Sequence, residues 1–269
     1  MDHFKRSKIG ILTYTSNMNM GTFLQAMAMK ESIQLASPES DVSIIPLLSE
    51  SKQRENKFGK LPLKPSHLYF PSYFRDRTRV RKYIQCQEDI LRLNHNDALH
   101  TDSYKESCHY INELDYDVIV VGSDACLKFY QWNFQEDKLP IFWLPQQIKS
   151  PHYMIGPSIG TTLTLDNLET HQKNQLQESI QGFNGIAVRD QLTKDFIIDL
   201  VPNAEVTIIP DPTFSLCIDT FEINRYIEEK KIPSDQRLIG IDVPMPTPHL
   251  KGLITVSYTH LTLPTKRIV

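Results

Sequence analysis

Short apolar runs rich in β-branched residues alternate with helical segments from residue 8 to residue 216. The strongest run is Tyr116–Val121 (YDVIVV), and its continuous apolar core is typical of a parallel strand that is covered on both faces. The alternation of strand and helix predicts an α/β fold with a doubly wound, mostly parallel sheet.

The pattern predicts the bounds of the individual elements. Strands are expected at Lys8–Thr15, Asp41–Leu48, Tyr116–Val121, His152–Ile159, Gly185–Val188 and Val206–Ile209. Helices are expected at Thr22–Leu35, Tyr73–Leu93, Ser103–Leu114, Asp166–Gln181 and Gln191–Leu200, with Asp166 as an N-cap.

The pattern weakens toward the end of the chain. Residues 1–216 are expected to form a Rossmann-like N-terminal domain, residues 217–236 a linker helix, and residues 237–255 the first strand of a second domain. A lone α/β strand cannot bury both of its faces, so we expect most of that second domain to be missing; the alternative is that the strand joins the first sheet. Residues 256–269 (VSYTHLTLPTKRIV) resemble translated sequencing-adapter DNA and are expected to be a non-native tail, unless they form a genuine β-hairpin.

Composition excludes several classes of protein. Lys and Arg number 29 against 32 Asp and Glu, so the net charge is −3 and no nucleic-acid partner is expected. The four cysteines contain no C-x-x-C pair and the nine histidines no H-x-x-x-H or H-E-x-x-H arrangement, so we predict no metal site and no disulfide framework. No signal peptide or membrane span is readable, and the expected location is the cytoplasm.

The first candidate site lies where the first strand turns into the first helix. A helix N-terminus that follows a small-residue turn favours a phosphate or carboxylate. Gly21 would let a ligand approach the backbone, while Asn19 and Gln25 offer amide contacts. The alternative is that Gly21 only makes the turn and that Gln25 caps the helix or faces solvent.

The second candidate site is Gly122-Ser123-Asp124, at the carboxyl end of the strongest strand. Ligands of α/β proteins bind at such strand ends. Ser123 and Asp124 could hydrogen-bond a sugar hydroxyl, and Asp124 could act as a general base. The alternative is that Asp124 caps the following helix.

Three further strand ends carry polar or small residues. Ser158 and Gly160 lie where the fourth strand passes into a loop and would form a crevice with the second site. Arg189 could clamp a carboxylate or phosphate, or pair with Asp190 or another neighbouring carboxylate. Asp211, between two prolines, is expected to hold its own turn and not to touch substrate.

A basic run covers residues 75–82. On a helix, Arg75 and Arg79 lie on one side, and Arg77 and Arg81 lie on nearly the opposite side. We therefore expect a solvated helix here and not a surface for an acidic partner.

Taken in this order, the segments resemble the polysaccharide pyruvyl transferase family over residues 8–216. The family's N-x-G-x-x-L-Q-x-x-A-L start is matched by Asn19, Gly21, Leu24, Gln25 and Ala28, with Met29 in place of the last Leu. Its D-x-x-x-x-G-S-D block is matched by Asp117, Gly122, Ser123 and Asp124. The later family segments are matched by Tyr153, Ser158 and Gly160, by Val188-Arg189-Asp190, and by Asp211–Phe214.

The resemblance implies a two-domain, glycosyltransferase-B-like fold that moves a pyruvyl group from phosphoenolpyruvate, without a cofactor, onto a sugar of an envelope polysaccharide. Ketal formation needs a general acid at the enol carbon and cations for the carboxylate and phosphate, and Arg189 is the cation within these motifs. Leu127 stands where the family usually has Trp, and the family's C-terminal histidine motif has no counterpart. We therefore expect this stretch alone to be inactive.

Two other functions stay open at this point. One is a related glycosyltransferase-B-like transferase that uses a nucleotide-sugar donor. The other is a non-catalytic domain that binds a sugar or a partner, which Leu127 and the absent second half suggest. The expected partner in each case is a glycan, and the sequence does not indicate an oligomeric state.

Overall fold

The computed structural model describes residues 6–16, 18–52, 70–128, 139–160, 165–217, 220–229 and 231. The chain divides into two compact units, Met1–Leu216 and Cys217–Val269. In the second unit the structure describes one helix, α7 (Thr220–Glu229), within the range expected for the linker helix. The strand expected in residues 237–255 and the tail at residues 256–269 lie outside the described residues.

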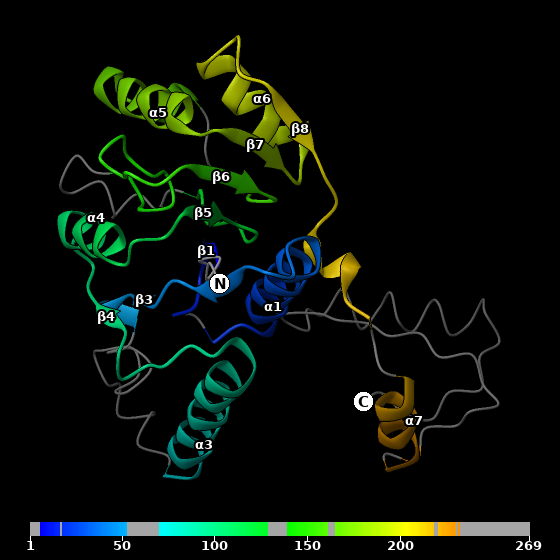
Figure 1. Ribbon diagram of the computed structural model, residues 1–269. Helices are drawn as coiled ribbons and strands as arrows, with labels where there is room; N and C mark the ends of the chain where they lie inside the picture. The colour runs from blue at the N-terminus through cyan, green and yellow to red at the C-terminus, as the bar shows by residue number, and fades with distance from the viewer. Residues whose placement is uncertain are drawn as a thin grey trace, which may run out of the picture. The chain divides into compact units, whose positions relative to one another are not determined.

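A six-stranded parallel sheet forms the centre of the first unit (Figure 1). Across the sheet the order is β2 (Asp41–Ile44), β1 (Lys8–Leu12), β5 (Val118–Val121), β6 (His152–Ile155), β7 (Gly185–Val188) and β8 (Val206–Ile208). Every neighbouring pair is parallel. The predicted doubly wound α/β fold is confirmed.

Helices cover both faces of this sheet, because alternate residues of each strand point to opposite sides. Val120 joins a core with side chains of α1 (Met20–Ala36) and α3 (Phe70–Cys86). Its neighbours Ile119 and Val121 join a second core with α4 (Tyr104–Glu113), α5 (Thr170–Gly182) and α6 (Gln191–Leu200). Both sides of the central strand are therefore buried, as its apolar sequence requires.

The order of the strands reverses between β1 and β5. From β1 the chain continues to β2 on one side, and it later returns to place β5 on the other side of β1. In open α/β sheets the crevice at the carboxyl ends of two such strands is where ligands bind. The residues that enter this crevice are those leading into α1 and those directly after β5.

One predicted strand and one predicted helix follow a different course in the structure. The strand expected at Asp41–Leu48 breaks at Pro46, which has no N–H to continue the ladder with β1. The chain then forms β3 (Leu47–Leu48), which pairs with β4 (Leu99–His100) in a separate sheet. The helix expected up to residue 93 continues beyond α3 as a π-helical turn, η2 (Gln87–Leu91).

Asp166 is not an N-cap, and that prediction was wrong. Asp166 lies in a short 3-10 turn, η3 (Leu165–Asn167), and α5 begins only at Thr170, with Glu169 as its N-cap. The backbone N–H of Glu169 donates to the side chain of Gln172 at 2.9 Å. The hydrogen bond from Glu169 to Gln172 fixes the N-cap of α5 three residues after Asp166, the N-cap that the sequence suggested.

Candidate functional site

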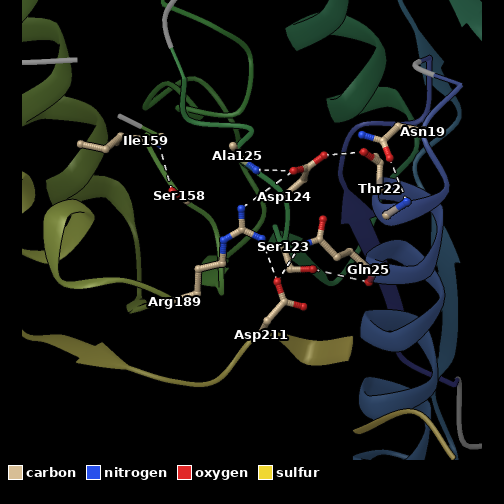
Figure 2. Close-up of polar contacts among 12 residues, drawn as sticks. Asn19, Thr22, Gln25, Ser123, Asp124, Ala125, Ser158, Ile159, Arg189 and Asp211 are labelled. Atoms are coloured by element: carbon tan, nitrogen blue, oxygen red, sulfur yellow. Dashed lines mark hydrogen bonds and ion pairs between the residues drawn. The ribbon is translucent and has the colours of Figure 1, made fainter. Parts of the chain in front are cut away.

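Asn19 fixes the start of α1. Its side-chain oxygen accepts a hydrogen bond from the backbone N–H of Gly21 at 2.8 Å, as an N-cap does (Figure 2). Its carbonyl oxygen accepts from the hydroxyl of Tyr83 at 3.1 Å, which ties α3 to the helix start. Gly21 lies exposed in the first turn, so its backbone is open to solvent.

Two side chains one turn apart on α1 point toward the strand ends (Figure 2). The hydroxyl of Thr22 donates to Asp124 Oδ2 at 2.7 Å, and the amide of Gln25 donates to Asp211 Oδ2 at 2.6 Å. Both residues are buried. Gln25 therefore does not face solvent. Thr22 was not among the residues predicted from the sequence, although residues three apart share one face of a helix.

Asp124 lies three residues after the end of β5, with a side chain that is 20% exposed. Its carboxylate accepts from the hydroxyl of Thr22 and, at 2.6 Å, from the backbone N–H of Ala125. Within the described residues no helix begins at Asp124, so helix capping does not explain it. The carboxylate is held from two sides and still reaches solvent.

Arg189 follows β7 and pairs with Asp211 at 2.8 Å. Its second terminal nitrogen lies 4.0 Å from Asp124 Oδ1. The adjacent Asp190 is not its partner, because the Asp190 side chain caps α6 through the backbone N–H of Thr193. Arg189 therefore lies between two carboxylates from different strand ends, with 21% of its side chain exposed.

Asp211 joins the turn after β8 to this group. Its Oδ1 accepts from the backbone N–H and the hydroxyl of Thr213, as expected for a residue that holds its own turn. Its Oδ2 accepts from Gln25 and Arg189, which the sequence did not indicate. Burial raises the pKa of Asp211, but hydrogen bonds from Thr213, Gln25 and Arg189 outweigh burial, so its pKa lies below the usual value.

We call these five residues the edge cluster: Thr22, Gln25, Asp124, Arg189 and Asp211. They come from α1 and from the ends of β5, β7 and β8, all at the carboxyl edge of the sheet (Figure 2). Two carboxylates and a guanidinium thus meet at the position where α/β folds bind ligands.

The small residues of the predicted site lie beneath this cluster. Ser123 is fully buried, and its hydroxyl donates to the carbonyl of Gln25 at 3.4 Å. Gly122 has φ +141°, and a Cβ there would lie 2.0 Å from the carbonyl oxygen of Ile155. The absence of a side chain at Gly122 therefore allows β5 and β6 to approach closely at their ends.

Ser158 and Gly160 stabilise the loop after β6. Ser158 is 6% exposed; its hydroxyl accepts from the backbone N–H of Gly160 at 3.0 Å, and its own N–H donates to the carbonyl of Asp124 at 3.2 Å. Gly21 is exposed, whereas Gly122 and Ser158 are buried. Ligand contact by the side chains of Ser123 and Ser158 stays a prediction.

Leu127 stands where the family usually has Trp. In the structure it lies beside a buried tryptophan from further along the chain, Trp143. Leu127 is fully buried, and its carbonyl accepts from the indole N–H of Trp143 at 3.0 Å. Trp143 is also fully buried, close to Phe196 of α6. An indole from elsewhere in the chain therefore stabilises the loop that carries Asp124.

The part of the chain that the structure describes holds no group of three or more His, Cys, Asp or Glu side chains that could bind a metal ion. The helices within that part are also too short or too polar to cross a bilayer.

No curated protein sequence matches the chain. The family model for polysaccharide pyruvyl transferase matches residues 19–250, starting at the N-cap of α1. The matched region includes every member of the edge cluster. On this match, which spans well over half of its residues, the chain belongs to the polysaccharide pyruvyl transferase family.

Proposed function

We propose that this chain moves the pyruvyl group of phosphoenolpyruvate onto a sugar of an envelope polysaccharide. Family membership indicates a transferase and a sugar acceptor. The observation that carries the finer proposal is the contact between Asp124 and Arg189: a carboxylate and a guanidinium, both partly exposed, lie 4.0 Å apart at the carboxyl edge of the sheet.

The chemistry requires a base and positive charge in one place. Addition of a sugar hydroxyl to C2 of phosphoenolpyruvate is accompanied by protonation of C3, which becomes a methyl group. A second hydroxyl of the sugar then displaces the phosphate at C2, which leaves a ketal and inorganic phosphate. Each hydroxyl must lose its proton, and negative charge on the carboxylate and on the leaving phosphate must be stabilised.

In this proposal Asp124 accepts the proton of the sugar hydroxyl. Thr22 and the N–H of Ala125 hold its carboxylate in place, so its orientation is set before the substrate binds. Arg189 binds the carboxylate or phosphate of the donor. Its guanidinium has five N–H donors, and the hydrogen bond from Nη1 to Asp211 uses one of them, so others can reach the donor. Asp211 and Gln25 are positioning residues for that guanidinium.

Ligand binding tests the proposal without requiring turnover. The full chain is titrated calorimetrically with phosphoenolpyruvate, with a set of pyruvyl-free envelope oligosaccharides, and with nucleotide sugars. We expect phosphoenolpyruvate and an oligosaccharide to bind. Asp124→Asn should weaken the oligosaccharide at least about tenfold, the scale of one charge-assisted hydrogen bond, and Arg189→Gln should weaken phosphoenolpyruvate similarly.

Asp199→Asn is the matched control, because Asp199 lies at the far end of α6 from Arg189 and the change removes the same charge. It should leave both affinities unchanged. Binding of a nucleotide sugar without phosphoenolpyruvate would favour the sugar transferase instead. If Asp124→Asn and Asp199→Asn weaken oligosaccharide binding equally, Asp124 does not belong to the site.

A further inference from the structure

A pocket of about 570 Å³ opens between the start of α1 and the last turns of α3. Its walls include Met18 and Met20 from the α1 side and Arg79, Lys82, Tyr83 and Cys86 from α3. A smaller cavity of about 60 Å³ shares Met18 and Tyr83 with it and extends inward to Thr15, Gln87 and His95. The two together reach from the surface to the carboxyl end of β1. Pockets of this size hold ligands as large as a drug molecule.

Two cations form one wall of the outer pocket. Arg79 and Lys82 are three residues apart on α3, so they lie on the same face of the helix. Among the described residues, no carboxylate lies within ion-pair distance of either side chain. The sequence predicted only a solvated helix here, because its arginines alternate between opposite sides, but Arg79 and Lys82 share the side that lines the pocket. Two unpaired cations beside a pocket favour an anion.

The inner cavity borders a buried hydroxyl without a partner. Thr15 is 3% exposed, and its Oγ1 has no hydrogen bond. The surrounding groups are held in place: the amide of Gln87 donates to the carbonyl of Thr15 at 2.8 Å, and its oxygen pairs with His95 at 2.9 Å. A buried polar atom normally finds a partner, but this hydroxyl is closed off from a water-sized probe, so it lies behind the wall of the inner cavity.

The pocket adjoins the edge cluster through the first turn of α1. Tyr83, on the pocket wall, donates to the carbonyl of Asn19, and Thr22 in the same turn binds Asp124. The first turn of α1 therefore forms part of the pocket wall and also holds a member of the edge cluster. A neutral sugar would leave both cations unused.

We propose that the pocket between α1 and α3 binds a phosphate ester, with Arg79 and Lys82 as its cationic contacts. The phosphate belongs either to a phosphorylated glycan acceptor or to the donor, and the experiment below separates these sources. The identity of the ligand rests on the proposed function, but the site itself does not.

Cys86 provides a direct probe, because it is exposed and lines the pocket. Cys217→Ser removes the other exposed thiol, while Cys126 is buried and burial raises the pKa of Cys108 to about 11, which makes that thiol slow to react. Alkylation of Cys86 is followed by mass spectrometry in the full chain at constant ionic strength. The probes are a hexose 1-phosphate, phosphoenolpyruvate, inorganic phosphate and the neutral hexose.

We expect the hexose 1-phosphate or phosphoenolpyruvate to slow alkylation of Cys86 at least threefold, and the neutral hexose to have no effect. Protection by the hexose 1-phosphate identifies the acceptor as the source of the phosphate, and protection by phosphoenolpyruvate alone identifies the donor. Arg79→Gln with Lys82→Gln should abolish protection. The matched control, Arg81→Gln with Lys105→Gln, removes the same charge from exposed positions outside the pocket and should retain it.

The proposal is wrong if no phosphate ester protects Cys86, if the neutral hexose protects equally, or if protection survives in the Arg79/Lys82 variant while its melting curve matches the parent. These outcomes differ from failure of the proposed function. In that case phosphate protection would persist, while oligosaccharide binding would no longer depend on Asp124.

Discussion

Gly122→Ala tests whether the Gly-Ser-Asp segment has a structural role in addition to any contact with substrate. Gly122 has φ +141°, a conformation that costs other residues about 1–3 kcal/mol. The added Cβ would also lie 2.0 Å from the carbonyl oxygen of Ile155, so the backbone of β6 must move. Overpacking of this kind costs about 1–3 kcal/mol. The sum is about 4 kcal/mol of unfolding free energy.

The assay is thermal unfolding followed by circular dichroism. For a unit of about 200 residues, 1 kcal/mol corresponds to a change of about 2–4 °C in Tm. Gly122→Ala should therefore lower Tm by roughly 10 °C, or prevent recovery of folded protein. The variant also moves the end of β5, so Asp124 should lose its place beside Arg189.

Gly21→Ala is the matched control. A Cβ at Gly21 meets only the side-chain oxygen of Asn19, at 3.2 Å, and alanine is favoured over glycine in helices by up to about 1 kcal/mol. Its Tm should stay within about 3 °C of the parent, the equivalent of 1 kcal/mol. The reasoning fails if Gly122→Ala melts like Gly21→Ala, because the close approach of β5 and β6 would then not require glycine.

Other changes test the remaining contacts. Asp211→Asn should lower the free energy of unfolding by about 1–2 kcal/mol at pH 7, measured by urea denaturation, because Arg189 loses its ionised partner at a partly exposed site. The pKa of Asp211 is depressed by folding, so its contribution is present above the unfolded pKa of about 4 and is lost as the pH falls through the folded pKa. The difference between Asp211→Asn and the parent should therefore shrink in acid, and a constant difference down to pH 2 contradicts this assignment. Trp143→Phe should cost about 1–3 kcal/mol by leaving the buried carbonyl of Leu127 unpaired; an unchanged urea midpoint would show that this hydrogen bond contributes little.

The sequence alone was sufficient for the α/β alternation and for several element bounds. The strand at Gly185–Val188 and the helix at Gln191–Leu200 have the predicted limits, because hydrophobic periodicity and capping are properties of neighbouring residues. For the same reason, Asp124 and Arg189 could be assigned to strand ends, and parallel strands present those ends at one edge of a sheet. The contacts that each of them makes there did not follow.

Those contacts were decided by the tertiary structure. Gln25 and Asp211 are 186 residues apart, and they meet because the turn after β8 returns across the sheet edge to α1. No local sequence pattern indicates a contact across that separation, so the sequence predicted that Asp211 would hydrogen-bond only within its own turn. The pocket beside Arg79 and Lys82 likewise depends on α3 packing against the start of α1, a contact between distant segments of the chain.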